Sequence, residues 1–384
     1  MTTSTATPYW RLSGFYLFYF ASIGVLVPYW PLYLESLGFG PREIGELMAV
    51  VMATKIIAPN IWGWIADHTG KRMMIVRIGS LLACIFFAGV FWSESYLWIA
   101  LVMAVFSFFW NATLPQFEAT TFNYLHGQTH RYSSVRLWGS IGFVLAALLI
   151  GYLLESSSAS IVPIAMLAMF ILIWLTSLVV PERSAGHLPL DEDSIFKVIK
   201  RPEVASLIVV VFLMQLSHGP YYTFYSIYLE QHGYSKIIIG GLWALGVIAE
   251  VGVFLVMHRL ILTFGLRRML MLSLLVASAR WLLLGSFVES FSVMLLIQLG
   301  HAATFGIFHA VSIQYIHHYF RGRHQGRGQA LYSSMSFGAG GAIGALMSGY
   351  TWELGATTTF FIAAVTSTLA LLITLLFVRD QPPE

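Results

Sequence analysis

The sequence predicts an all-α integral membrane protein with twelve transmembrane helices in two pseudo-symmetric six-helix bundles. Of its 384 residues, 58% are hydrophobic and 10% are charged, whereas a soluble domain carries about 25% charged residues. The hydrophobic residues gather in stretches of about 20 residues, the length that crosses a bilayer as a helix. Short sequence segments of the first half also recur in the second half.

The twelve apolar stretches follow one another along the whole chain. The predicted spans cover residues 10–34, 44–65, 73–92, 96–120, 133–154, 159–180, 204–230, 237–258, 268–288, 290–316, 327–350 and 357–378. The first stretch is too long for the core of a signal peptide and has no small-residue cleavage pattern. We therefore expect an uncleaved first span.

The charges between the spans alternate. One set of loops carries arginine, lysine and histidine, whereas the other carries mainly glutamate, such as Glu35 and Glu230. By the positive-inside rule, we expect the basic loops and both termini in the cytoplasm, and the chain in the cell (inner) membrane. The formal charge of +3 then reflects cations in loops, so we expect no nucleic-acid partner.

A polar segment, 181–203, separates the first six spans from the last six. The sequence Tyr33-Leu-Glu-Ser-Leu-Gly-Phe39 recurs as Tyr228-Leu-Glu-Gln-His-Gly-Tyr234, an offset of 195 residues (228 − 33). We expect an N-terminal six-helix bundle over 1–180, a cytoplasmic linker over 181–203 and a C-terminal six-helix bundle over 204–384. Internal repeats around a central binding site are typical of secondary transporters.

A polar motif, Gly63-Trp-Ile-Ala-Asp-His-Thr-Gly-Lys-Arg72, lies between the second and third predicted spans. Gly63 lets two helices approach, Gly70 permits a tight reversal, and the cations face the positive side of the membrane. Asp67 is suited to accept hydrogen bonds from a helix N-terminus or from an arginine. The pattern G-x-x-x-D-x-x-G-K-R resembles the loop signature of the major facilitator superfamily. This resemblance implies that fold, with Gly63, Asp67, Gly70, Lys71 and Arg72 closing the cytoplasmic side.

Ionisable side chains inside the spans are costly in a bilayer and need a partner or a function. The cations Lys55, Arg136 and Arg280 outnumber the carboxylates Glu118 and Glu250. A surplus of positive charge favours an anionic substrate, and arginine can hold a carboxylate through two parallel hydrogen bonds. The alternative for Glu118 and Arg136 is a structural ion pair that clamps two helices.

Several of these residues extend the resemblance. Pro115-Gln-Phe-Glu-Ala119 and Ser134-Val-Arg-Leu-Trp-Gly139 resemble helices 4 and 5 of lactose permease, where a glutamate and an arginine with the same spacing bind the sugar. Arg280 and His301 match that family's helix 9 arginine and helix 10 histidine. The family's carboxylate one turn after this histidine is replaced by Thr304 here, so its proton coupling does not carry over unchanged.

A second resemblance is to the phenylpropionate permease branch of the superfamily, through Ser217-His-Gly-Pro-Tyr-Tyr222, Gly246-Val-Ile-Ala-Glu-Val251 and Val135-Arg-Leu-Trp-Gly-Ser140. It implies a proton-coupled symporter of an aromatic monocarboxylate, such as 3-phenylpropionate, that works by alternating access. We expect Glu250 to carry the proton, with His301 and His309 as alternatives. We expect the substrate to bind at Lys55, Glu118, Arg136, Trp138, His218, Tyr221, Tyr222 and Arg280.

Other functions remain open at this stage. A sugar (oligosaccharide) or nucleoside proton symporter is the main alternative, and a non-transporting membrane sensor is more remote. The sequence has no nucleophile elbow, phosphate loop or metal-ligand spacing, and its single cysteine is Cys84. We therefore expect no enzymatic activity, no catalytic residue, no metal and no cofactor, with the proton gradient as the driving force. The expected partners are a small-molecule substrate, protons and the lipid bilayer, and the expected state is a monomer.

Overall fold

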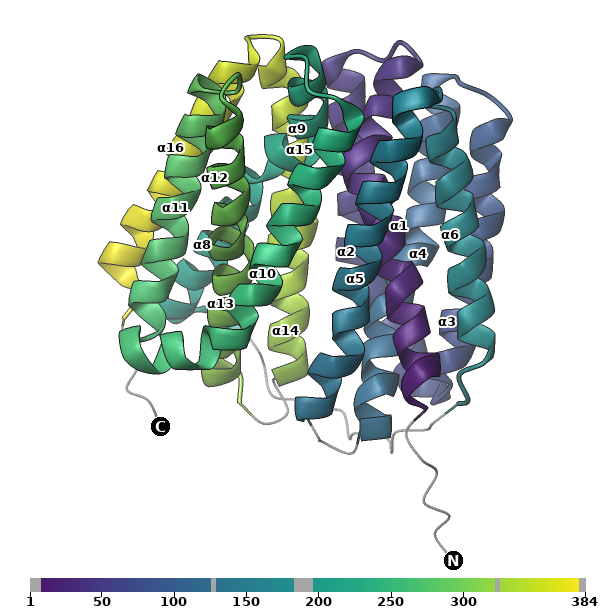
Figure 1. The fold of residues 1–384 in the computed structure, drawn as a ribbon. Helices are drawn as coiled ribbons and strands as arrows, with labels where there is room; N and C mark the ends of the chain where they lie inside the picture. The colour runs from purple at the N-terminus through teal and green to yellow at the C-terminus, as the bar shows by residue number, and fades with distance from the viewer. Residues whose placement is uncertain (1–7, 126–128, 183–195, 322–324, 380–384) are drawn as a thin grey trace, which may run out of the picture.

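The computed structural model describes residues 8–125, 129–182, 196–321 and 325–379, and these residues form helices joined by short turns, with no strand among them (Figure 1). The helices run roughly parallel in two groups that lie side by side, residues 8–182 in one and residues 196–379 in the other. We call these groups the N-terminal half and the C-terminal half. Most of the predicted linker, residues 183–195, lies outside the described residues.

The N-terminal half contains six long helices that match the first six predicted spans. They are α1 (Tyr9–Ser36), α2 (Pro41–Thr69), α3 (Arg72–Phe87, extended by a 3-10 turn over Ala88–Phe91), α4 (Tyr96–Leu125), α5 (Thr129–Ser156) and α6 (Ile161–Leu178).

The C-terminal half begins with a short helix, α7, and three of its six predicted spans are interrupted. Its helices are α7 (Phe196–Ile199), α8 (Pro202–Ser217), α9 (Gly219–Gln231), α10 (Lys236–Phe264), α11 (Leu266–Ser286), α12 (Phe291–His301), α13 (Phe308–Tyr319), α14 (Gln325–Ser333), α15 (Gly341–Trp352) and α16 (Ala356–Phe377). The break between α8 and α9 falls at His218, where the following Pro220 lacks a backbone N–H. Segments of π-helix join α12 to α13 (Ala302–Ile307) and α14 to α15 (Ser334–Gly340).

The surface of these helices is that of a membrane protein. Eleven helices among the described residues are long and apolar enough to cross a membrane. The remaining predicted span, residues 327–350, is the eleventh along the chain and corresponds to α14, its π-helical segment and α15. Large apolar side chains lie bare on the outside, including Leu255 (83% exposed) and Leu376 (74% exposed). Such a surface would aggregate in water but is solvated by lipid. The predicted all-α fold of membrane spans in two halves is confirmed.

The helix ends repeat between the halves as the sequence does. Gly38 and Gly70 follow α1 and α2 with φ of 87° and 67°, and Gly233 and Gly265, 195 residues later, have φ of 81° and 78°. Residues with a side chain rarely adopt this left-handed region, so glycine ends each of these helices.

The two halves contact each other at the end of the bundle where α2 and α10 begin, which we call the closed end. There α2 packs on α15 so tightly that a Cβ on Gly45 would lie 2.7 Å from the Gly349 Cα. The equivalent contact joins α10 to α5, where a Cβ on Gly240 would lie 2.4 Å from the Ala147 carbonyl oxygen. Gly45 and Gly240 occupy equivalent positions of the repeat, so the same close contact between helices occurs at two places in the interface.

Polar contacts reinforce the closed end. Arg42 on α2 pairs with Glu353 beyond α15 at 2.5 Å, and the Tyr350 hydroxyl donates to Glu46 at 2.8 Å. From the closed end the helices of the two halves diverge toward the opposite end, where α1 begins and α16 ends (Figure 1). We call that opposite end the termini end.

Candidate functional site

The first group of polar residues, which we call the N-terminal cluster, lies between α1, α4 and α5. The Arg136 Nε lies 3.7 Å from the Glu118 Oε1, and the Tyr132 hydroxyl donates to the same oxygen at 3.2 Å. The Arg136 guanidinium lies 3.7 Å from the centre of the Phe20 ring, a cation–π contact. The Arg136 and Glu118 side chains are 31% and 34% exposed, so solvent reaches an ion pair that lies within membrane-spanning helices.

Small residues make room for this cluster. A Cβ on Gly139 would lie 2.7 Å from the Arg136 Nη1 and 2.8 Å from the Phe20 Cδ2. Contacts this short do not occur for real side chains, so only glycine allows Arg136 and Phe20 to stack here. Tyr132 precedes Arg136 by four residues, one helical turn, which places both on the face of α5 toward Glu118.

Trp138 does not join this cluster. Two positions along a helix differ by about 200° in direction, so Trp138 and Arg136 lie on opposite faces of α5. The Trp138 Nε1 donates to the Tyr9 hydroxyl at 3.0 Å, and its ring meets the ring of Trp10 at 5.5 Å. Trp10 is largely exposed, so this group lies at the outer surface near the start of α1.

Lys55 lies halfway along α2, and its ammonium group makes no hydrogen bond or ion pair with any residue that the structure describes. The residue before it, Thr54, donates to Ser107 and accepts from Asn111, both at 2.9 Å, which fixes α2 against α4. Lys55 is therefore a positive charge in the membrane interior without an acidic partner among the described residues.

The second group, which we call the C-terminal cluster, centres on Arg280 of α11. Arg280 is 2% exposed, and its Nε donates to the Ile297 carbonyl at 2.8 Å while its Nη1 donates to the Thr304 hydroxyl at 2.5 Å. The guanidinium also lies 4.7 Å from the Trp281 ring and 5.0 Å from the Tyr221 ring. No carboxylate of the described residues lies within 4.0 Å of it.

Glu250 lies halfway along α10 beside His301. The His301 Nε2 lies 4.0 Å from the Glu250 Oε2, and the Glu250 side chain is 16% exposed. α5, which carries Arg136, packs against α10, which carries Glu250. The N-terminal and C-terminal clusters therefore lie on helices that meet at the interface between the halves.

His218 and Tyr221 pack around Arg280. His218 is fully buried, with its Nδ1 2.8 Å from the Met214 carbonyl and its Nε2 3.4 Å from the Thr304 hydroxyl. The Tyr221 hydroxyl donates to the Gln298 Oε1 at 2.9 Å.

Tyr222 stacks on the His218 ring at 5.7 Å. The Trp281 ring meets the His218 ring at 4.8 Å and the Tyr221 ring at 5.7 Å, so aromatic rings surround His218 and contact Arg280.

His309 lies farther toward the termini end. Its Nδ1 lies 2.9 Å from the Tyr332 hydroxyl. Phe305 stacks between the rings of His301 and His309, at 5.5 Å and 6.1 Å. The three residues are spaced by four positions, which places them along one face of the helix, and the segment between the two histidines, Ala302–Ile307, is π-helical.

The loop motif forms a compact polar unit at the termini end. Arg72 donates from Nη2 to the Asp67 Oδ1 at 2.7 Å and from Nη1 to the Gln116 Oε1 at 2.6 Å, which ties the α2–α3 connection to α4. Gly70 ends α2 in the left-handed conformation, and Gly63 lies against the Gln116 side chain. Lys71 follows directly and is exposed.

Sequence reasoning missed several residues of these clusters. A helical-turn argument from Arg136 identifies Tyr132. Phe20, Gln116 and Tyr332 come from distant positions, and no local pattern marks them. Gln298 is also unmarked by any local pattern, because its contact with Tyr221 depends on how α9 and α12 pack.

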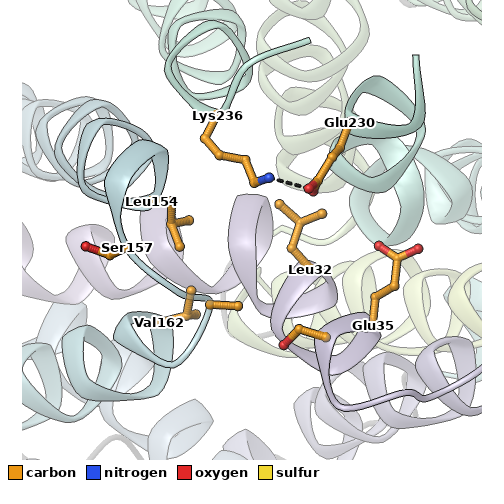
Figure 2. Close-up of a pocket in the computed structure, with 9 residues that line it drawn as sticks. Leu32, Glu35, Leu154, Ser157, Val162, Glu230 and Lys236 are labelled. Carbon is orange, nitrogen blue, oxygen red and sulfur yellow. Dashed lines mark hydrogen bonds and ion pairs between the residues drawn. The ribbon is translucent and has the colours of Figure 1, made fainter. Parts of the chain in front are cut away.

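A separate cavity lies at the closed end, away from both clusters. Its volume is about 300 Å³, and Figure 2 shows Glu35 of α1 and the Glu230–Lys236 ion pair of α9 and α10 at its edge. Apolar residues of α1, α5 and α6 form the other wall: Leu32, Leu154 and Val162. None of the predicted substrate-binding residues lines this cavity, so it is not the predicted site.

Comparisons with known proteins agree with the arrangement of the helices. The MFS_1 like family matches residues 9–363. A probable 3-phenylpropionic acid transporter of Escherichia coli (strain K12) is 26% identical, over 93% of this chain and 94% of its own. A maltose permease of Geobacillus stearothermophilus is also 26% identical, over 94% and 92%. The crystal structure of a point mutant of the nucleoside transporter NupG superposes with a TM-score of 0.86 at 16% identity, covering 96% of this chain and 98% of that one.

Proposed function

Because the chain belongs to the MFS_1 like family of multi-pass membrane transporters, we propose that it is a proton-coupled symporter of an aromatic monocarboxylate such as 3-phenylpropionate. Alternating access of a site between the two halves moves the substrate. In this proposal the protein is a monomer of the cell (inner) membrane with both termini in the cytoplasm. It is not an enzyme, and the proton gradient drives it without a cofactor.

The observation that carries this proposal is the environment of Arg280. Arg280 is 2% exposed, and its guanidinium has no carboxylate within 4.0 Å among the described residues. A buried arginine without a counter-ion is costly in a membrane, so its retention favours a role in binding. A substrate carboxylate supplies the missing negative charge through charge-assisted hydrogen bonds.

The other charges of the interior support an anionic substrate. Glu118 pairs with Arg136, and Glu250 lies beside His301, which leaves Lys55 and Arg280 uncompensated among the described residues. Lys55 then attracts the carboxylate from the N-terminal half, while the Glu118–Arg136 pair lies on the solvent-accessible side and orients the substrate as it enters.

The aromatic residues of the C-terminal cluster suit an aromatic substrate. The Tyr221 ring contacts the Arg280 guanidinium, and the rings of His218 and Tyr222 pack beside it. A phenyl ring gains both apolar burial and edge-to-face contacts between such rings. In this proposal Tyr221 and Tyr222 contact the substrate ring, and His218 supports Tyr222 from behind. Trp138 has no direct role, because its ring lies at the outer surface beside Trp10.

We assign the proton to Glu250. Its carboxyl group lies halfway along a spanning helix, is mostly buried, and has a titratable neighbour in His301. α10 packs on α5 of the other half, which carries Arg136, so opening and closing of the halves changes the charge near Glu250 and with it the free energy of the bound proton. His301 and His309 are the alternative carriers, because the stacked row through Phe305 places them in sequence toward the termini end.

The loop motif is assigned a gating role. The Asp67–Arg72–Gln116 unit stiffens the α2–α3 connection at the termini end. Lys71 is exposed and contacts the C-terminal half when that end closes. Gly63 and Gly70 keep the connection short enough for such an approach.

The test is substrate-induced proton movement. De-energised cells that make the protein are suspended in weak buffer, and 3-phenylpropionate, maltose and a nucleoside are added in turn. The proposal predicts that the external medium becomes alkaline with the aromatic acid alone. Alkalinisation with maltose or the nucleoside alone would contradict it.

A sugar or nucleoside symporter is the second candidate, and one observation favours it. The Glu118–Arg136 pair is about one third exposed and occupies the positions that resemble the sugar-binding residues of lactose permease. The same assay separates the two candidates. A non-transporting sensor is the remote alternative, and it would bind a ligand without any flux of ligand or protons.

A further inference from the structure

Thr304 is the residue that joins Arg280 to the rest of the C-terminal cluster. It lies in the π-helical segment between α12 and α13 and is 1% exposed. Its hydroxyl oxygen lies 2.5 Å from the Arg280 Nη1, 3.4 Å from the His218 Nε2 and 3.5 Å from the His301 carbonyl oxygen. One hydroxyl group thus connects α11, the α8–α9 break and α12.

The direction of each hydrogen bond follows from which atoms can donate. The Met214 carbonyl only accepts, so the His218 Nδ1 carries a hydrogen and, in the neutral ring, Nε2 is an acceptor. The Arg280 Nη1 only donates, so the Thr304 oxygen accepts from it. The single hydroxyl hydrogen then points either to the His218 Nε2 or to the His301 carbonyl oxygen. In both arrangements the Thr304 side chain is neutral and the His218 ring needs no second hydrogen.

This neutrality leaves the positive charge of Arg280 intact. The Glu250 carboxylate lies beside His301, and no ion pair joins it to Arg280. The Arg280 Nη2 is buried and makes no hydrogen bond to any residue that the structure describes. The Arg280 Nη2 donor and the positive charge of Arg280 therefore remain available to a ligand. An acidic residue at position 304 would neutralise that charge.

We propose that Thr304 determines the charge preference of this transporter: its hydroxyl holds Arg280 in place without neutralising it, so the site selects an anionic over a neutral substrate. This inference rests on the proposed function, because it concerns the carboxylate of that substrate. Thr304 is a positioning residue, since it acts on the substrate through Arg280. An acidic residue at this position would pair with Arg280 and repel a second carboxylate.

The experiment compares Thr304→Asp with Thr304→Asn, two side chains of nearly equal size that differ in charge. Binding of 3-phenylpropionate and of its neutral amide, 3-phenylpropanamide, is measured by calorimetry on each purified full-length variant in detergent. We expect Thr304→Asp to lower the ratio of acid to amide affinity by about tenfold or more relative to Thr304→Asn. Thr304→Ser keeps the hydroxyl, so we expect it to keep the ratio of the unmodified protein.

Three results would overturn the inference in different ways. Equal ratios in Thr304→Asp and Thr304→Asn would show that residue 304 does not set the charge preference, while the proposed function would stand. Equal loss of acid and amide binding in Thr304→Asp would also overturn it, because an effect of charge on the substrate carboxylate must spare the neutral amide. No binding or uptake of the acid by the unmodified protein would overturn the proposed function and, with it, this inference.

Discussion

The charged clusters of the two halves place arginine in opposite surroundings. Arg136 pairs with Glu118, and the two side chains are 31% and 34% exposed. Arg280 is 2% exposed and accompanied by a neutral hydroxyl group. A hydrated ion pair contributes about 0–1 kcal/mol, whereas a buried charge left alone costs several kcal/mol. The charge of Arg136 is therefore compensated without a ligand. The charge of Arg280 is not, so a bound anion would offset the free-energy cost of burying it.

The largest effect is expected for Arg280→Gln. The substitution removes the charge that we assign to the substrate carboxylate, so uptake of 3-phenylpropionate should fall by about 100-fold or more. Uptake is measured in proteoliposomes, with the amount of inserted protein determined in parallel. Near-normal uptake by this variant would show that Arg280 does not bind the substrate carboxylate.

A second large effect concerns the proton alone. Glu250→Gln keeps the size of the side chain but cannot release a proton, so substrate-driven alkalinisation should be lost while exchange of external for internal substrate continues. Both are measured on the same proteoliposome preparation. Unchanged alkalinisation would move the proton to His301 or His309, and their Gln variants would be tested next.

The N-terminal cluster should respond more weakly. Glu118→Gln leaves Arg136 partly hydrated, so we expect KM for 3-phenylpropionate to change by about tenfold or less, with little change in maximal rate. If the protein were a sugar symporter, this substitution would abolish transport instead. A complete loss of transport in Glu118→Gln, together with a small effect of Arg280→Gln, would show that the N-terminal cluster and not the C-terminal cluster binds the substrate.

The smallest effect is expected for Phe20→Leu. The substitution removes a cation–π contact worth about 0.5–1 kcal/mol and keeps the apolar volume, so KM should rise by about two- to fivefold. The matched control is Phe18→Leu, two residues earlier on α1, which should leave KM unchanged. Equal effects of the two substitutions would mean that the Phe20–Arg136 contact has no part in binding.

Much of the fold could be predicted because the signals are local. Span lengths follow from runs of apolar residues, and the repeat follows from segments such as those that end at Gly38 and Gly233. The glycines that seal the closed end were also visible as a repeat, because Gly240 follows Gly45 by the same 195 residues. Their contact partners on α5 and α15 were not, since packing between distant helices leaves no pattern in either one.

The candidate site was predictable only where two residues share a helix or a known motif. The ion pair of Glu118 with Arg136 was an alternative suggested by two opposite charges inside neighbouring spans, and the structure contains that pair. The outward direction of Trp138 depends on the rotation of α5, and the bridge from His218 through Thr304 depends on a helix break and a π-helical segment. Neither feature follows from apolar periodicity.

The most direct test of the account is the proton movement that accompanies 3-phenylpropionate, measured side by side with its neutral amide in proteoliposomes of the unmodified protein. The account predicts that the acid carries protons into the vesicles and that the amide does not. Equal proton movement with both compounds, or none with the acid, would contradict the claim that the uncompensated charge of Arg280 selects an anionic substrate.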